Sequence, residues 1–190
     1  MKIIANTKLE LHGKKLLLKF MKMYKHKYPK FIKNVIFDEA RPHSYFDEST
    51  NTIILGIKDD WDYNIIVEMF LHESFHCYSH DFCKSNSQLC DVYLRYIRHN
   101  YKYRGFEFEN FVEAKNSKND KKKDYDILNN FADHLIVLFN TIKFMTTIMK
   151  VDIKIFRSKS ELYHKFILYL LKNYKKVEKD LEIFGLNYEF

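Results

Sequence analysis

The first hydrophobic pattern along the chain has the period of an amphipathic helix and covers about residues 7–28. Pro29 ends this pattern, and Gly13 is a weak point within it because glycine destabilises a helix interior. We therefore predict a first helix over these residues. Its apolar positions recur every three or four residues and are Leu9, Leu16, Leu17, Phe20 and Met23.

Three short β-like segments follow, at residues 34–37, 44–47 and 52–57. They are rich in β-branched and aromatic residues, and turn signals at Arg41-Pro42 and at residues 48–51 separate them. An apolar segment without glycine or proline then covers residues 64–78 and predicts a buried helix. This order of elements predicts a small antiparallel or mixed sheet beside that helix.

The second half of the chain has helical periodicity. One helix is predicted over about residues 87–101, capped by Ser87, and two longer ones over about residues 125–149 and 159–181. The last begins with a capping-box pattern at residues 158–161 and ends near Gly185. The polar, lysine-rich residues 115–124 predict an exposed loop suited to be a lid or a partner contact. The predicted buried side of the 87–101 helix is Leu89, Val92, Tyr93, Tyr96 and Ile97.

These elements predict an α+β fold that is mostly helical and forms one domain over residues 1–190. A chain of 190 residues, of which 46% are hydrophobic, is long enough to bury one substantial core. Its longest aliphatic run, at residues 135–139, is too short to cross a bilayer, so we expect no membrane insertion.

The cysteines and the start of the chain bear on the compartment. Cys77, Cys83 and Cys90 are odd in number and lack a Cys-x-x-Cys spacing, which favours reduced thiols over a disulfide framework. The first residues lack the long apolar stretch of a signal peptide. We therefore expect a cytoplasmic protein.

The formal net charge of +7 favours acidic partners. Acidic residues alternate with the lysines that supply this charge, so a solvated surface is the simpler interpretation. Contact with a nucleic acid or an acidic protein is the alternative. The lysines concerned are residues 121–123 together with Lys172, Lys175, Lys176 and Lys179.

The segment with the most specific chemistry is His72-Glu73-Ser74-Phe75-His76. On a helix, the four-residue spacing puts both imidazoles on one face, one turn apart, where they can hold a single Zn²⁺ with Glu73 beside it. The pattern resembles the active-site helix of the zincin metallopeptidases. A core helix whose histidines are simply hydrogen-bonded is the alternative.

A catalytic zinc needs three protein ligands and one open position, so the histidine pair leaves one ligand to be found. We predict Asp133, because it lies in the most apolar stretch of the 125–149 helix, where a buried acid needs compensation. The remaining candidates are Asp126, His134, His80, Glu107, Glu109 and Glu113.

Residues 129–136, Asn-Asn-Phe-Ala-Asp-His-Leu-Ile, resemble the second motif of the ImmA/IrrE-type metallopeptidases. In that family an acidic residue precedes an Asn-x-Phe-Ala-x-x-Leu-Leu pattern, and the corresponding position here is Ile127, next to Asp126. The resemblance implies a gluzincin-type arrangement, in which an acidic residue on a later helix completes the zinc site.

These features predict a zinc-dependent metallopeptidase acting on a peptide or protein. Zinc lowers the pKa of a bound water towards about 7, and Glu73 accepts its proton and passes it to the leaving amine. Tyr78, Tyr93 and Tyr101 are candidate donors to the oxyanion. One alternative is a catalytically inactive zincin-like module that regulates or binds nucleic acid. Another is a closed structural zinc site made of His76, His80, Cys83 and Cys90.

Overall fold

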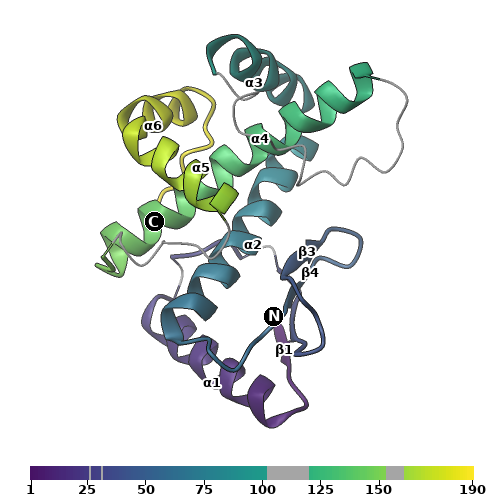
Figure 1. The fold of residues 1–190 in the computed structure, drawn as a ribbon, viewed down its shortest axis with the longest axis vertical. Coiled ribbons are helices and arrows are strands. Elements are labelled where there is room, and N and C mark those ends of the chain that lie inside the picture. The colour runs from purple at the N-terminus through teal and green to yellow at the C-terminus, as the bar shows by residue number, and fades with distance from the viewer. Residues whose placement is uncertain (26, 31, 102–119, 153–160) are drawn as a thin grey trace. The chain divides into compact units, whose positions relative to one another are not determined.

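The computed structural model describes residues 1–25, 27–30, 32–101, 120–152 and 161–190, and of residues 120–127 and 161–164 it describes the backbone alone. The chain folds into two compact units, residues 1–81 with Phe190 and residues 82–189. Both contain helices, and the first also contains a small sheet (Figure 1). The predicted α+β, mostly helical fold class is therefore confirmed. The single domain over residues 1–190 stays a prediction.

The sheet of the first unit is mixed and has four strands in the order β1-β2-β4-β3. The first three strands in this order run parallel, and β3 runs antiparallel to β4 at one edge. The sequence predicted three of the four strands. It missed β1, which is as short as β3 but, unlike β3, does not lie between two turn signals. The strands are β1 (Lys2–Ile4), β2 (Asn34–Phe37), β3 (Tyr45–Asp47) and β4 (Thr52–Leu55).

Helix α1 (Lys8–Met23) packs against the sheet of its unit. It begins with a capping box, in which the Thr7 hydroxyl accepts from the amide of Glu10 and the Glu10 carboxylate accepts from the amide of Thr7. The predicted end near residue 28 was wrong, because the helix stops at Met23. Gly13 is a close-approach position rather than a weak point, since a Cβ there would lie 2.7 Å from the Phe37 ring.

Helix α2 (Tyr63–Ser85) carries the His-Glu-x-x-His motif, as predicted. The apolar face of α2 includes Phe70, whose side chain is fully buried. The Phe70 ring meets the ring of Phe20 on α1 edge-on, with 5.9 Å between the ring centroids. The loop between β3 and β4 reaches the same helix through Asn51, whose side chain accepts a 3.5 Å bond from the Cys77 thiol. The sheet therefore lies beside the motif helix. Among the described residues, no helix is long and apolar enough to span a membrane.

The second unit contains the predicted helices with different boundaries. Helix α3 (Ser87–Asn100) is capped by Asn86 rather than by the predicted Ser87. It buries Tyr93 and Ile97 as predicted and leaves Tyr96 half-buried, but the predicted core positions Leu89 and Val92 are 38% and 46% exposed. The helix thus buries a narrower stripe than its leucine and valine content suggests.

The later helical segments also differ from the prediction in length. Helix α4 (Asp120–Lys143) begins within the predicted 115–124 loop, so residues 120–124 are helical. A π-helix, η3 (Phe144–Ile148), follows α4. The predicted 159–181 helix is two helices separated at Asn173, α5 (Glu161–Lys172) and α6 (Tyr174–Ile183). Gly185 follows α6 at φ +69°, as expected of a helix-ending glycine. The rest of the loop and the start of the 158–161 capping box lie outside the described residues.

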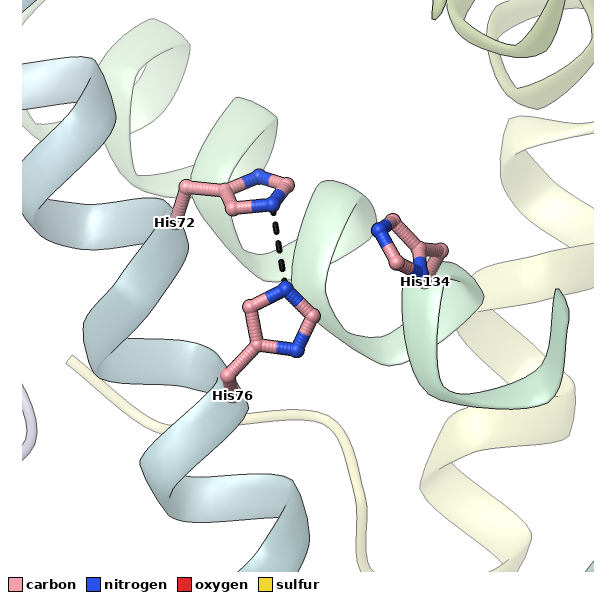
Figure 2. A group of neighbouring side chains, drawn as sticks. All are labelled: His72, His76 and His134. Atoms are coloured by element: carbon pink, nitrogen blue, oxygen red, sulfur yellow. Dashed lines mark hydrogen bonds between the residues drawn. The ribbon is translucent and has the colours of Figure 1, made fainter. Parts of the chain in front are cut away.

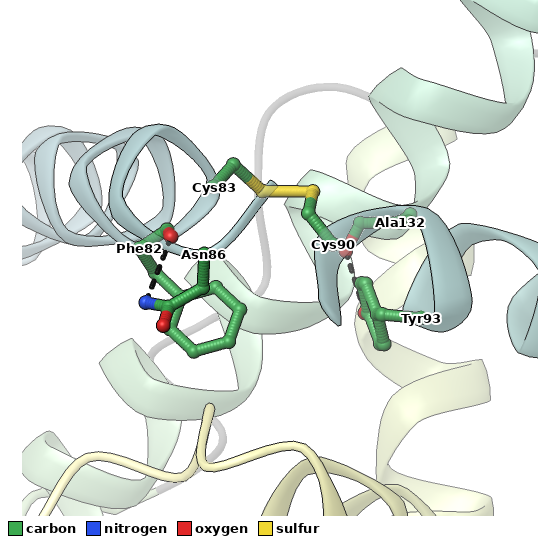
Figure 3. The surroundings of a disulfide bond; sticks show 6 residues. All are labelled: Phe82, Cys83, Asn86, Cys90, Tyr93 and Ala132. Atoms are coloured by element: carbon green, nitrogen blue, oxygen red, sulfur yellow. Dashed lines mark hydrogen bonds between the residues drawn. A yellow bond between two sulfur atoms is a disulfide. The ribbon is translucent and has the colours of Figure 1, made fainter. Parts of the chain in front are cut away.

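A disulfide joins Cys83 to Cys90, so the prediction of three reduced thiols was wrong for this pair (Figure 3). The cause is local. Asn86 ends α2 with a 2.9 Å bond from its amide to the Phe82 carbonyl, and α3 begins at the next residue. This tight turn brings the two cysteine Cα atoms to 5.2 Å, within disulfide range. Cys77 is a free, buried thiol whose pKa burial raises to about 11.

Candidate metal centre

His72 and His76 lie one turn apart on α2 and point their rings at each other (Figure 2). The two Nε2 atoms are 3.1 Å apart, and the rings meet edge-on with their centroids separated by 4.8 Å. His72 is buried at 8% exposure and His76 is half-buried. The two rings therefore lie together on one helix face, as the four-residue spacing predicts, and their role as zinc ligands stays a prediction.

The 3.1 Å separation suits two kinds of contact. A zinc ion with bonds of about 2.0–2.1 Å to two imidazoles at a tetrahedral angle would hold their nitrogens roughly 3.3 Å apart. The same separation also fits one ring donating an Nε2–H to the Nε2 of the other. The observed separation is thus that of a hydrogen bond, and it is only slightly shorter than the separation a shared zinc ion would require.

Glu73 follows His72 directly and is buried at 5% exposure. Successive helix positions differ by about 100°, so its carboxylate projects from the face next to the histidine pair rather than from the same face. Its other neighbour, Ser74, is fully buried and donates its hydroxyl to the Phe70 carbonyl at 2.6 Å. Glu73 is thus a buried carboxylate next to the histidine pair along the helix. The hydroxyl of its other neighbour, Ser74, already has an acceptor.

His134, on α4, is half-buried. Its Nδ1 lies 2.9 Å from the Asn130 carbonyl one turn earlier, and because a carbonyl only accepts, Nδ1 carries the proton. The Nε2 atom of a neutral ring is then the one with a free lone pair, which is the atom that binds a metal. His134 offers one such ligand atom, and the ligand atoms of His72, His76 and His134 all lie within 4.8 Å of one another (Figure 2).

This donor set fits a zinc ion. Three imidazoles with a fourth, open position are an established ligand set for catalytic zinc. Imidazole also suits copper, iron and nickel, so the ligands favour a transition metal over magnesium or calcium, which prefer oxygen.

The predicted third ligand, Asp133, is half-buried on α4 and is not a member of that histidine group. It lies near Tyr93 of the same unit. Burial raises the pKa of the Tyr93 hydroxyl well above its usual value, and the nearby charge of Asp133 adds to the effect. Its neighbour His134 was among the alternatives. Asp133 as a zinc ligand stays a prediction.

The other candidate ligands are accounted for as far as the structure describes them. His80 is exposed on α2, where its ring contacts the Glu48 carboxylate at 3.3 Å and meets Phe46 edge-on. The Asp126 side chain lies outside the described residues. So do Glu107, Glu109 and Glu113.

The closed structural zinc site of His76, His80, Cys83 and Cys90 is contradicted. The Cys83–Cys90 disulfide engages both sulfur atoms, and a metal binds the thiolate form of cysteine. The sequence suggested this site because the four residues follow one another at short spacing. The turn at Asn86 instead brings the two sulfurs to each other.

Two of the three tyrosines considered as oxyanion donors give their protons to other groups. The Tyr93 hydroxyl donates to the Ala132 carbonyl at 2.9 Å (Figure 3), and the Tyr101 hydroxyl donates to Asp180 at 2.6 Å. Tyr78 is half-buried on α2, one turn from Ser74. It is the remaining member of this set.

One lysine of the predicted basic surface already contacts other side chains of the second unit. Lys176 binds Asp180 at 2.6 Å and lies 3.7 Å from the centre of the Tyr101 ring. It is therefore part of a packed network rather than a free cation. The side chains of lysines 121–123 lie outside the described residues, so contact with an acidic partner stays a prediction.

No family model, no curated protein and no solved structure matches the chain. The resemblance to zincins therefore rests on the five-residue motif, on the order of the elements around it and on the histidine geometry.

Proposed function

We propose that the protein is a zinc-dependent peptidase whose metal is held by His72, His76 and His134, with His134 in place of the predicted Asp133. The observation that carries the proposal is the convergence of two imidazole Nε2 atoms at 3.1 Å, with a buried carboxylate at the next position after His72 in the helix. The ring nitrogen of His134, within 4.8 Å of the other two ligand atoms, supports the choice of third ligand. Peptides as the substrate class come from the motif's resemblance to zincins.

Bound zinc would supply a Lewis acid and a water whose pKa lies near 7. Glu73 accepts the proton of the attacking water and later delivers it to the leaving amine. Its position next to His72 in the sequence keeps it near the ligands without occupying a coordination position. His72 and Glu73 are buried at 8% and 5% exposure, and burial strengthens the electrostatic interactions of such groups.

The ligand chemistry also favours a catalytic over a purely structural zinc. A structural site is closed by four protein ligands, commonly including cysteine, whereas three histidines leave one position open. The thiols of Cys83 and Cys90 are joined to each other, and the Cys77 thiol is bonded to Asn51. An open position is what a water-activating metal requires.

The first experiment measures metal content. Protein purified without chelator should contain one equivalent of zinc by mass spectrometry. His72→Ala and His76→Ala should lose it, and the matched control His80→Ala, an exposed histidine of the same helix, should keep it. Absence of stoichiometric zinc from the wild type, or its retention in both ligand variants, contradicts the proposal.

The second experiment separates an enzyme from an inactive metal-binding or nucleic-acid-binding module. The zinc protein should cleave members of a peptide library, and Glu73→Gln should keep the zinc but lose cleavage. The matched control Glu48→Gln replaces an exposed glutamate and should cleave at the wild-type rate. Zinc-loaded wild type that cleaves no peptide would favour the inactive module. Undiminished cleavage by Glu73→Gln would remove Glu73 from its role.

A further inference from the structure

Glu68 is a buried carboxylate that the proposed reaction does not use. It lies on α2, one turn before His72, and is 7% exposed. Residues 68, 72 and 76 recur every four positions, so they lie along one face of the helix. This face therefore carries an acid followed by the two histidines. All three belong to the first unit.

A histidine that binds a metal through one ring nitrogen needs an acceptor for the N–H of the other, because this bond fixes the tautomer and the ring orientation. His72 turns its Nε2 towards His76, so its Nδ1 lies on the side of the ring away from His76 (Figure 2). Long side chains on a helix lean towards the N-terminus, onto the preceding turn. For His72 the residue one turn earlier on that face is Glu68.

We propose that Glu68 is a positioning residue for His72: its carboxylate accepts the Nδ1–H of His72 and so keeps the Nε2 lone pair directed at the metal position. A buried carboxylate needs hydrogen-bond donors, and a neutral imidazole supplies one at this spacing. The inference deepens the proposed metal site, and its consequence for zinc affinity rests on that site. Its consequence for the histidine tautomers does not.

The proposal fixes the protons of the metal-free pair. With its proton on Nδ1, His72 accepts at Nε2, so the 3.1 Å bond must be donated by the Nε2–H of His76. The two histidines are then opposite tautomers, and zinc binding requires His76 to move its proton from Nε2 to Nδ1. Without an acceptor at the Nδ1 of His72, either ring could donate the 3.1 Å bond, so the direction of this bond is what the Glu68 contact decides.

The test reads the tautomers directly. Long-range ¹H–¹⁵N NMR of the metal-free protein, at a pH where both rings are neutral, should show His72 protonated on Nδ1 and His76 on Nε2. Glu68→Gln keeps an accepting oxygen and should keep this pattern. Glu68→Leu removes the acceptor and should populate both tautomers of His72. The matched control is Glu10→Gln, a buried acid of α1 that bonds backbone amides, and it should leave both rings unchanged.

Zinc titration gives the second readout. Glu68→Leu should weaken zinc binding by about 10–100-fold, the usual effect of losing such a partner, and Glu68→Gln should bind more tightly than Glu68→Leu. Wild-type His72 protonated on Nε2, or equal zinc affinity of Glu68→Leu and wild type, overturns the inference. If Glu68→Leu does not fold, the wild-type tautomers and Glu68→Gln decide. Glu68-dependent zinc binding without peptide cleavage refutes the proposed peptidase alone.

Discussion

Asp180 is the centre of a buried polar network in the second unit, and its removal gives the most quantitative stability prediction. The carboxylate accepts hydrogen bonds from the hydroxyls of Tyr101 and Tyr96, at 2.6 and 2.8 Å, and from Lys176 at 2.6 Å. It is 5% exposed, and Tyr101 is also 5% exposed. Asp180→Ala therefore leaves a buried tyrosine hydroxyl without its acceptor.

The expected loss in the free energy of unfolding is about 2–4 kcal/mol at neutral pH. Leaving one buried donor without a partner costs about 1–3 kcal/mol, and the loss of the half-buried Tyr96 bond adds to this. The Lys176 pair contributes at most about 0.5 kcal/mol, because its lysine side chain is 46% exposed. Tyr101→Phe leaves the other two bonds in place and should cost about 1–1.5 kcal/mol.

The effect should depend on pH in a defined direction. Burial alone would raise the pKa of Asp180, but hydrogen bonds from Lys176, Tyr101 and Tyr96 outweigh it and hold this pKa below its ordinary value of 3.8. A carboxyl whose pKa is lower in the folded state contributes its stability above the unfolded-state pKa and loses it as the pH falls. The stability gap between wild type and Asp180→Ala should therefore shrink below about pH 4.

Urea unfolding followed by far-ultraviolet circular dichroism, at several pH values, measures both quantities. Glu178→Ala on the same helix is the matched control, and as a half-exposed position it should change stability by less than about 0.5 kcal/mol. The reasoning fails if Asp180→Ala is as stable as wild type at neutral pH, or if the gap stays constant as the pH falls.

Three further substitutions test the fold. Gly13→Ala should destabilise by about 1–3 kcal/mol, although alanine is the better helix former by about 1 kcal/mol, because its Cβ would lie 2.7 Å from the Phe37 ring; a higher melting temperature would contradict the packing. Cys83→Ser should lower the free energy of unfolding by about 2–3 kcal/mol, and dithiothreitol should lower that of the wild type equally while leaving Cys83→Ser unchanged. Wild type that alkylates at Cys90 without reduction would contradict the disulfide. Gly185→Ala, at φ +69°, should cost about 1–2 kcal/mol in a thermal melt, and an unchanged melt would argue against this conformation.

The elements with a clear hydrophobic period were predictable from the sequence. The motif helix has a long apolar segment without glycine or proline, and three strands are separated by recognisable turns. The errors lie where tertiary contacts decide. The role of Gly13 depends on Phe37, a neighbour that a periodic pattern does not include. The hydrophobic period continues through the helix break at Asn173, whose side-chain amide donates to the Tyr169 carbonyl one turn earlier at 2.8 Å.

The histidine pair was predictable because both residues belong to one helix, and a four-residue spacing fixes their relative direction. The proposed third ligand was not predictable, because His134 lies on a helix that begins more than fifty residues after the motif helix begins. Asp133 and His134 are adjacent, so they differ by about 100° in direction, and apolar context alone does not choose between them. One signal was available: a histidine on a helix can donate its Nδ1–H to the carbonyl four residues earlier, here that of Asn130, which makes Nε2 the nitrogen that can act as a ligand.

The central claim is that three histidines form one metal site, and zinc titration calorimetry of a matched variant pair tests it most directly. We expect the wild type to bind one zinc. His134→Ala should bind it more than about 100-fold more weakly, which is a larger loss than the roughly 10–100-fold expected when only a hydrogen-bond partner of a ligand is removed. Asp133→Ala, one residue away, should bind zinc with nearly wild-type affinity. Unchanged affinity in His134→Ala, or a large loss in Asp133→Ala alone, would contradict the account.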